Sequence, residues 1–261
     1  EHPLIKAYYN SSLERANRAR LAHKLMQAFY LDKSNDVPRE PLLDDLKPLI
    51  EAAYHACSAH DFDSAWKIFR KRISPGPNFI LSKKYGAYQI ELDIIRGFFP
   101  KGDINEEPYV SMSYRKCKLL EHAGFCLLSH GSIEEATHLF ERQIAASIEV
   151  NNFLSLSEGY QHLAKAYIYL GKLIYAERAA NNGIEAANYL RDVKGKISKR
   201  KKLENKRNAL CWLAWINHLM GNIELAEKYF SQAHTLHQQI NGKNSYLDGL
   251  RGAQHTDHLI H

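Results

Sequence analysis

The sequence predicts an all-α protein built from repeated helical hairpins, and three observations support this prediction. A pattern of small and aromatic residues recurs four times along the 261 residues. The 14 Gly and 8 Pro are few for an all-β protein with many turns. Hydrophobic residues make up 45% and charged residues 25% of the chain, an ordinary globular balance that argues against disorder.

The N-terminal residues 1–35 are expected to form a separate helical segment. Residues 3–31 show amphipathic helical spacing at Leu4, Leu13, Leu21 and Leu25 but carry no repeat turn. The stretch KSNDVPREP (33–41) is typical of a linker because it combines Pro with polar residues. We expect the hairpin array to occupy residues 36–261.

Each repeat centres on an alanine that follows a short turn. In three repeats a Gly stands five residues before this alanine, where it would end the first helix in a left-handed conformation, whereas the first repeat has His60 there. An aromatic residue follows the alanine by four positions, except in the third repeat, which has Ala180. The segments are AHDFDSAWKIF (59–69), SHGSIEEATHLF (129–140), YLGKLIYAERAA (169–180) and LMGNIELAEKYF (219–230), with anchors Ala65, Ala136, Ala176 and Ala226.

A second set of positions aligns upstream of each turn. Small residues there allow a neighbouring helix to approach closely, and we expect the aromatic residue after the anchor to fill the gap between repeats. The aligned pairs are Ala52-Ala53, Ala123-Gly124, Leu163-Ala164 and Leu213-Ala214.

The remaining segments fit the same plan. Residues 82–99 are expected to form one helix of an extra pair, and residues 100–108 a loop. Residues 246–261 resemble the first helix of another repeat. The chain starts with Glu1-His2-Pro3 rather than Met, and we expect it to be part of a longer protein.

The repeats resemble the tetratricopeptide repeat (TPR). Four further stretches, HPLIKAYY (2–9), PLIEAAYHACSAHDFDSAW (48–66), LSKKYGAYQIELDIIRGFF (81–99) and YLDGLRGAQHTDHLI (246–260), are similar to the C-terminal half of bacterial STAND NTPases, which are related to NLR and NB-ARC proteins. In this resemblance, residues 2–9 correspond to the tail of a winged-helix region.

The resemblance implies a cytoplasmic protein-binding sensor array of a signal-transducing NTPase, in some relatives an antiphage defence protein. Binding of a protein or peptide trigger would lead to nucleotide exchange and homo-oligomerisation of the full-length protein. No G-x-x-x-x-G-K-[ST] phosphate loop occurs in the chain, so ATP or ADP with Mg would bind only in a module upstream of Glu1.

A basic segment offers an alternative function in nucleic-acid binding. Residues 194–207 carry a net charge of +7, which leaves −1 for the rest of the chain, since the total is +6. We expect this stretch to lengthen a helix or form an insertion between repeats, and to bind nucleic acid weakly and without sequence preference at most. Its basic residues are Lys194, Lys196, Lys199, Arg200, Lys201, Lys202, Lys206 and Arg207.

The surface expected to bind a partner is the concave one, lined by the first helix of each repeat. Under the TPR resemblance, lining positions lie about 18, 15, 11, 8 and 7 residues before the anchoring alanine. Aromatic anchors dominate protein recognition, so Phe125, Tyr169 and Trp215 are the strongest candidates. The full set is Lys118, Phe125, Gln161, Lys165, Tyr169, Asn208, Trp215 and His218.

We expect no enzyme activity, cofactor or metal site in this chain. The spacing of His255, His258 and His261 permits a metal site, but a solvated helix face is the interpretation we favour. The four cysteines lack C-x-x-C pairing and are interpreted as core residues in a reducing cytosol. The sequence contains no apolar run long enough to span a membrane.

Overall fold

The computed structural model describes residues 3–38, 40–75, 80–190 and 199–260, with backbone only for residues 3–14. Every regular element in these ranges is helical, as the sequence predicts. The chain divides into an N-terminal unit, Glu1–Ser111, and a C-terminal unit, Met112–His261. Within the described ranges, no helix combines the length and the apolar character needed to cross a membrane.

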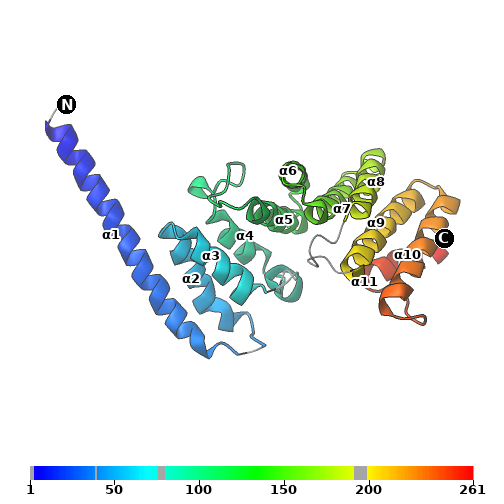
Figure 1. Cartoon of the computed structure of the whole chain (residues 1–261), viewed down its shortest axis with the longest axis horizontal. Helices are drawn as coiled ribbons and strands as arrows, with labels where there is room; N and C mark the ends of the chain where they lie inside the picture. Colours follow the sequence, from blue (N-terminus) through cyan, green and yellow to red (C-terminus); the bar gives the residue numbers. More distant parts are fainter. Residues whose placement is uncertain (1–2, 39, 76–79, 191–198, 261) are drawn as a thin grey trace. The chain divides into compact units, whose positions relative to one another are not determined.

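The N-terminal unit starts with the long helix α1, Pro3–Lys33, followed by α2, Lys47–Ser58, and α3, Phe62–Lys67 (Figure 1). The chain continues from α3 as π-helical turns, Ile68–Ile73 and Ile80–Lys84, and then forms α4, Tyr88–Arg96. Residues 82–99 therefore do not form one helix, because Gly86 adopts a φ of 64° and interrupts it.

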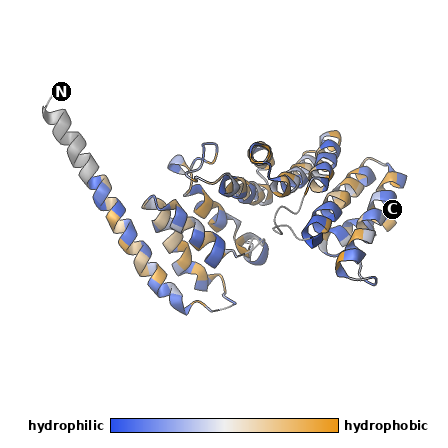
Figure 2. Cartoon of the chain, viewed as in Figure 1, coloured by the Kyte–Doolittle hydropathy of each residue, from blue (hydrophilic) through white to orange (hydrophobic). Residues whose placement is uncertain are grey.

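Helix α1 packs along α2 and leaves much of its apolar surface exposed. Nδ1 of His23 lies 2.8 Å from Nδ1 of His55 on α2, and Arg20 donates to Nδ1 of His60 at 2.6 Å. Leu21 and Leu25, two of the residues that predicted an amphipathic helix, are 59% and 65% exposed. Figure 2 shows hydrophobic and hydrophilic residues interspersed along the coloured part of α1. The packed face of α1 is thus largely polar, which apolar spacing alone did not indicate.

The described part of the C-terminal unit, residues 112–190 and 199–260, contains three helical hairpins and one further helix. The hairpins are α5–α6, α7–α8 and α9–α10, and α11 follows the third of them (Figure 1). The bounds are α5 Ser113–His130, α6 Ile133–Glu149, α7 Phe153–Tyr169, α8 Leu173–Asn188, α9 Lys199–Leu219, α10 Ile223–Asn241 and α11 Gly249–Ile260. Helix α11 contacts both α9 and α10, as expected for the first helix of another repeat.

The turn inside each hairpin has the predicted left-handed backbone. Gly131, Gly171 and Gly221 have φ values of 87°, 68° and 79°, and His60 in the first repeat has a φ of 57°. The backbone NH of Gly131 and that of Ser132 bond to carbonyls in the last turn of α5, which completes the helix end. The turn geometry therefore persists in the first repeat although His60 lacks the freedom of Gly.

The anchoring alanines and their aromatic partners form the core of the hairpins. All four anchors are fully buried. A Cβ added to Gly124 would lie 2.6 Å from the Phe140 ring, so α5 passes directly against that ring. The other side of Phe140 stacks on His162 of the next hairpin at 5.2 Å. The aromatic residue thus fills the gap between repeats, as predicted.

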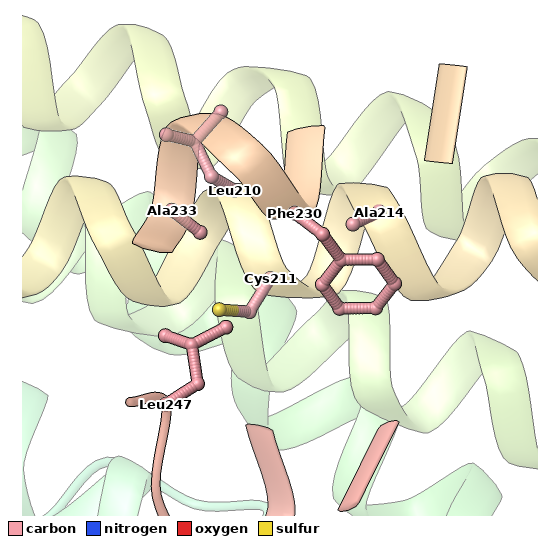
Figure 3. Packing of buried hydrophobic residues seen from close by; sticks show 6 residues of the cluster. All are labelled: Leu210, Cys211, Ala214, Phe230, Ala233 and Leu247. Carbon is pink, nitrogen blue, oxygen red and sulfur yellow. The ribbon is translucent and has the colours of Figure 1, made fainter. Parts of the chain in front are cut away.

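The last hairpin repeats this arrangement with α11 as the neighbouring helix. Figure 3 shows Phe230 beside Ala214, together with Leu210, Cys211, Ala233 and Leu247. His255 of α11 stacks on the Phe230 ring with ring centres 4.9 Å apart, and His258 lies tilted against the same ring at 5.3 Å. His258 is 5% exposed, so the expected solvated histidine face is wrong at this position. His261 lies outside the described residues.

We predict that Gly124→Ala destabilises the C-terminal unit by about 2 kcal/mol, because the new methyl group collides with Phe140 and the tightly packed core must shift. Urea denaturation followed by circular dichroism measures this change. Ser129→Ala, at an exposed position of the same helix, is the matched control and should change stability little. Equal stability of the Gly124→Ala variant and the wild type would contradict the proposed close approach of the two helices.

Candidate functional site

The first helices of the C-terminal unit, α5, α7 and α9, pack side by side. We call the surface formed by their predicted lining residues the first-helix face. The structure separates these residues into two groups. One group bonds to other residues of the unit and holds the hairpins together, and the other presents exposed side chains.

An ion-pair network that is buried at Glu121 and partly exposed at Lys201 belongs to the first group and joins all three hairpins. Lys118 Nζ on α5 lies 2.5 Å from Glu121 Oε2 and 2.9 Å from Glu158 Oε2 on α7. Lys201 on α9 lies 3.4 Å from the other oxygen of Glu158. His162 Nε2 lies 3.7 Å from Glu121 Oε1. The two lysines and two glutamates balance in charge, which makes their burial tolerable.

The network shifts the pKa values of its central pair in opposite directions. Burial alone would lower the pKa of Lys118, but the carboxylates of Glu121 and Glu158 outweigh it and raise that pKa. Burial alone would raise the pKa of Glu121, but Lys118, with help from His162, lowers it. Both side chains are therefore held in their charged forms.

Two further predicted residues also bond within the unit. Gln161 on α7 is 7% exposed and donates to Asn205 Oδ1 on α9 at 3.3 Å. Asn208 accepts from Arg207, whose guanidinium also lies 3.1 Å from Nδ1 of His237 on α10. Gln161 thus joins α7 to α9, whereas Asn208 bonds within α9, and both amides have less hydrogen-bonding capacity left for an external ligand.

The second group lies on α5 and α7 and is partly exposed, since Phe125 and Lys165 are half-buried and Tyr169 is exposed. Lys165 Nζ lies 5.9 Å from the ring centre of Phe125 and 5.5 Å from that of Tyr169, in cation–π geometry. Tyr169 is 53% exposed. We call Phe125, Lys165 and Tyr169 the aromatic–lysine cluster. Within the described ranges, Lys165 forms no ion pair.

Trp215 and His218 on α9 occupy an intermediate position. Trp215 packs against the core cluster of Figure 3 and stacks on His218 at 4.9 Å. Nδ1 of His218 lies 3.2 Å from Nδ1 of His258 on α11. Both side chains are half-buried, and α11 contacts His218 through His258 and Asp257.

The basic segment is only partly described, since Lys194 and Lys196 lie outside the described residues. The remaining part lengthens α9, as one of the two sequence interpretations expected. Arg200 donates to Asn241 on α10 at 3.1 Å, and Lys202 donates to the carbonyl of Asn188 at 3.2 Å. Lys199 and Lys206 also lie on α9. Several of these cations therefore bind neighbouring helices.

Cysteine and histidine chemistry is limited in the described residues. All four cysteines are buried, and burial raises the pKa values of Cys57 and Cys211 to about 12. Across the described ranges, no group of three or more His, Cys, Asp or Glu side chains is arranged to hold a metal ion. Such thiols are poor nucleophiles, because the thiolate is the reactive form.

Sequence reasoning missed His162, which contacts Phe140, Phe125 and Glu121 at once. It lies 14 residues before Ala176, next to a lining position but outside the set taken from the TPR resemblance. The sequence gives the place of His162 in its repeat. It does not give the contacts of His162, because these come from the preceding hairpin, which places an aromatic ring and a carboxylate beside it.

No protein-family model matches the sequence, and no curated protein matches it. Among solved structures, the chain is similar to a crystal structure of kinesin light chain nearly identical TPR-like repeats from Podosopora anserina, with 15% identity over 93% of this chain and 99% of that chain and a TM-score of 0.41. A second crystal structure of these repeats gives the same identity and TM-score and is covered over 100% of its chain.

We predict that Glu121→Gln lowers the free energy of unfolding by about 3 kcal/mol, because Lys118 loses its closest charged partner while remaining buried. Glu149→Gln, an exposed position at the end of α6, is the matched control and should have little effect. Chemical denaturation of both variants at neutral pH measures the difference. A loss equal to that of the control would show that the network contributes no stability.

The lowered pKa of Glu121 also predicts an acid-dependent loss of stability. Because the folded state holds this carboxylate charged below its ordinary pKa of 4.5, the unfolded state binds more protons near that pH. The stabilisation is therefore complete above about pH 5 and declines as the pH falls further. The stability difference between the wild type and Glu121→Gln should shrink between pH 6 and pH 3, measured by denaturation at each pH. A constant difference would contradict the assignment.

Proposed function

We propose that the C-terminal unit is a protein-binding scaffold that recognises its partner through the first-helix face. The observation that carries this proposal is the aromatic–lysine cluster. Its two rings and its unpaired ammonium group are presented on two consecutive first helices. Aromatic side chains with large exposed surfaces bury much apolar area on binding at a small cost in side-chain entropy.

The surrounding network gives the cluster a rigid base. Lys118, Glu121 and Glu158 hold α5 and α7 together one to two turns away along the same helices. Together with Lys201, which pairs with Glu158, their charges cancel, so Lys165 supplies the net charge of the aromatic–lysine cluster. A complementary partner surface therefore presents an apolar side chain together with a hydrogen-bond acceptor or a carboxylate.

Trp215 and His218 extend the proposed surface onto α9. Their half-buried side chains leave part of the stacked rings accessible beside α11. Three other predicted lining residues already use polar groups in bonds within the unit, namely Lys118, Gln161 and Asn208. They form part of this surface but do not offer free polar groups to a partner.

We further propose that this chain is the ligand-sensing region of a bacterial STAND signal-transducing NTPase that acts in antiviral defence. The similarity of four segments to that class supports this proposal. ATP or ADP with Mg would bind a separate module, and oligomerisation would follow binding of the protein trigger in the cytoplasm. The coding sequence upstream of Glu1 tests this directly, because a phosphate loop followed by a winged helix is expected there.

We predict that Tyr169→Ala and Lys165→Ala each weaken capture of the cognate protein partner at least tenfold, because they remove an anchor and the net charge of the cluster. Cross-linking in the source cells, purification and quantitative mass spectrometry measure partner recovery. Tyr175→Ala is the matched control, because this tyrosine is similarly exposed but lies on the second helix α8. Equal partner recovery by all three variants would reject the cluster as the binding site.

We predict that Trp215→Ala also reduces partner capture without changing helix content, since this ring is only partly buried. Circular dichroism and the same recovery assay distinguish the two effects. A loss of helical signal instead would mean that Trp215 acts as a core residue of the last hairpin.

A further inference from the structure

A pocket of about 390 Å³ lies within the N-terminal unit, away from the residues that the sequence singled out. Helix α2, the following turn, the end of α4 and the loop after it form its walls. Tyr54 on α2 stands eleven residues before Ala65, the same repeat position that Phe125 occupies before Ala136. Its volume lies in the range of small-ligand sites. Its principal lining residues are Tyr54, His60, Phe62, Arg96, Lys101 and Tyr109.

One side of the pocket is an aromatic wall. Phe62 and Tyr109 stack with ring centres 5.0 Å apart and an interplanar angle of 27°. His60 lies nearly parallel to Tyr109, at 6.4 Å and 17°. Tyr54 and Tyr109 are 58% and 49% exposed, although both are large rings. The wall thus presents flat apolar surface on which a planar group can stack.

Two cationic side chains, Arg96 and Lys101, also line the pocket. Arg96 lies 3.8 Å from Asp93, a long ion pair, and the same carboxylate oxygen of Asp93 also accepts from Gln89 at 2.7 Å. Lys101 forms no ion pair within the described ranges. With Asp93 opposing one of the two cations, the lining carries one net positive charge, which favours a ligand with a single negative charge.

Backbone strain coincides with this pocket. His60 and Lys101 have φ values of 57° and 52°, in the left-handed region that L residues rarely adopt. Both line the pocket. Gly102 directly follows Lys101, so the residue type that tolerates a left-handed backbone occurs at the next position and not at Lys101 itself. A strained residue other than Gly is retained at such a position where its side chain has a function that Gly, which has no side chain, could not supply.

We propose that this pocket binds an aromatic carboxylate, with the ring against Tyr54 and Tyr109 and the carboxylate at Arg96 and Lys101. The assignment stands on the pocket's own geometry and is independent of the protein-binding face of the C-terminal unit. A free aromatic acid and a peptide that ends in an aromatic residue share this chemistry.

Titration of the whole chain with indole-3-acetate, followed by calorimetry, tests the proposal. We expect saturable binding, with indole-3-acetamide binding at least fivefold more weakly because it has the same ring without the charge. A short peptide ending in tryptophan, with a free or an amidated end, shows whether a chain terminus also enters. Absence of saturable binding of all these probes, or equal affinity for the acid and its amide, would overturn the proposal.

Lys101→Gly separates binding from folding, because it removes the charge and relieves the strained backbone. It should lower affinity for indole-3-acetate at least fivefold while the melting temperature is unchanged or higher. Lys101→Arg should retain affinity, and Tyr109→Ala should weaken both the acid and the amide. Lys71→Gln, an exposed lysine outside the pocket, is the matched control. Wild-type affinity of Lys101→Gly would refute the assigned role of Lys101.

Discussion

The close approach of the two helices in each hairpin is the constraint on which this protein depends. Gly124 illustrates it, because no room exists between its Cα and the Phe140 ring for even a methyl group. The same ring then stacks on His162 of the next hairpin, so one aromatic side chain sets both the spacing inside a repeat and the spacing to its neighbour. Phe230 does the same between α9 and α11. Dense packing of this kind transmits any change in volume to the neighbouring helices.

This packing places polar residues of successive first helices opposite one another. In the C-terminal unit, Lys118, Glu121, Glu158 and Lys201 consequently bond to each other and stabilise the array. Of the neighbouring residues, Tyr169 is exposed to solvent, and Phe125 and Lys165 are half-buried. The first-helix face thus contains both residues that hold the hairpins together and residues that we propose bind a partner. The two roles differ in burial, since buried charges require partners whereas exposed aromatic rings keep their binding energy for a ligand.

The N-terminal unit uses the same repeat position for a different purpose. Tyr54 contributes to a pocket there because the loop after α4 brings Lys101 and Tyr109 to its side. The left-handed backbone of His60 and Lys101 indicates that this region departs from the most relaxed local conformation. The repeat pattern therefore positions side chains, while the irregular segments between repeats decide what those side chains face.

Much of the fold was predictable from the sequence because its signals are local. The anchoring alanines, the turn glycines and the helical periodicity each act over fewer than about twenty residues, and the hairpins follow from them. The burial of His258 and the ion pair between Lys118 and Glu158 depend on residues from other helices. Only the tertiary structure decided which lining residues pair internally and which stay exposed, because this choice depends on distances between helices that a periodic pattern does not contain.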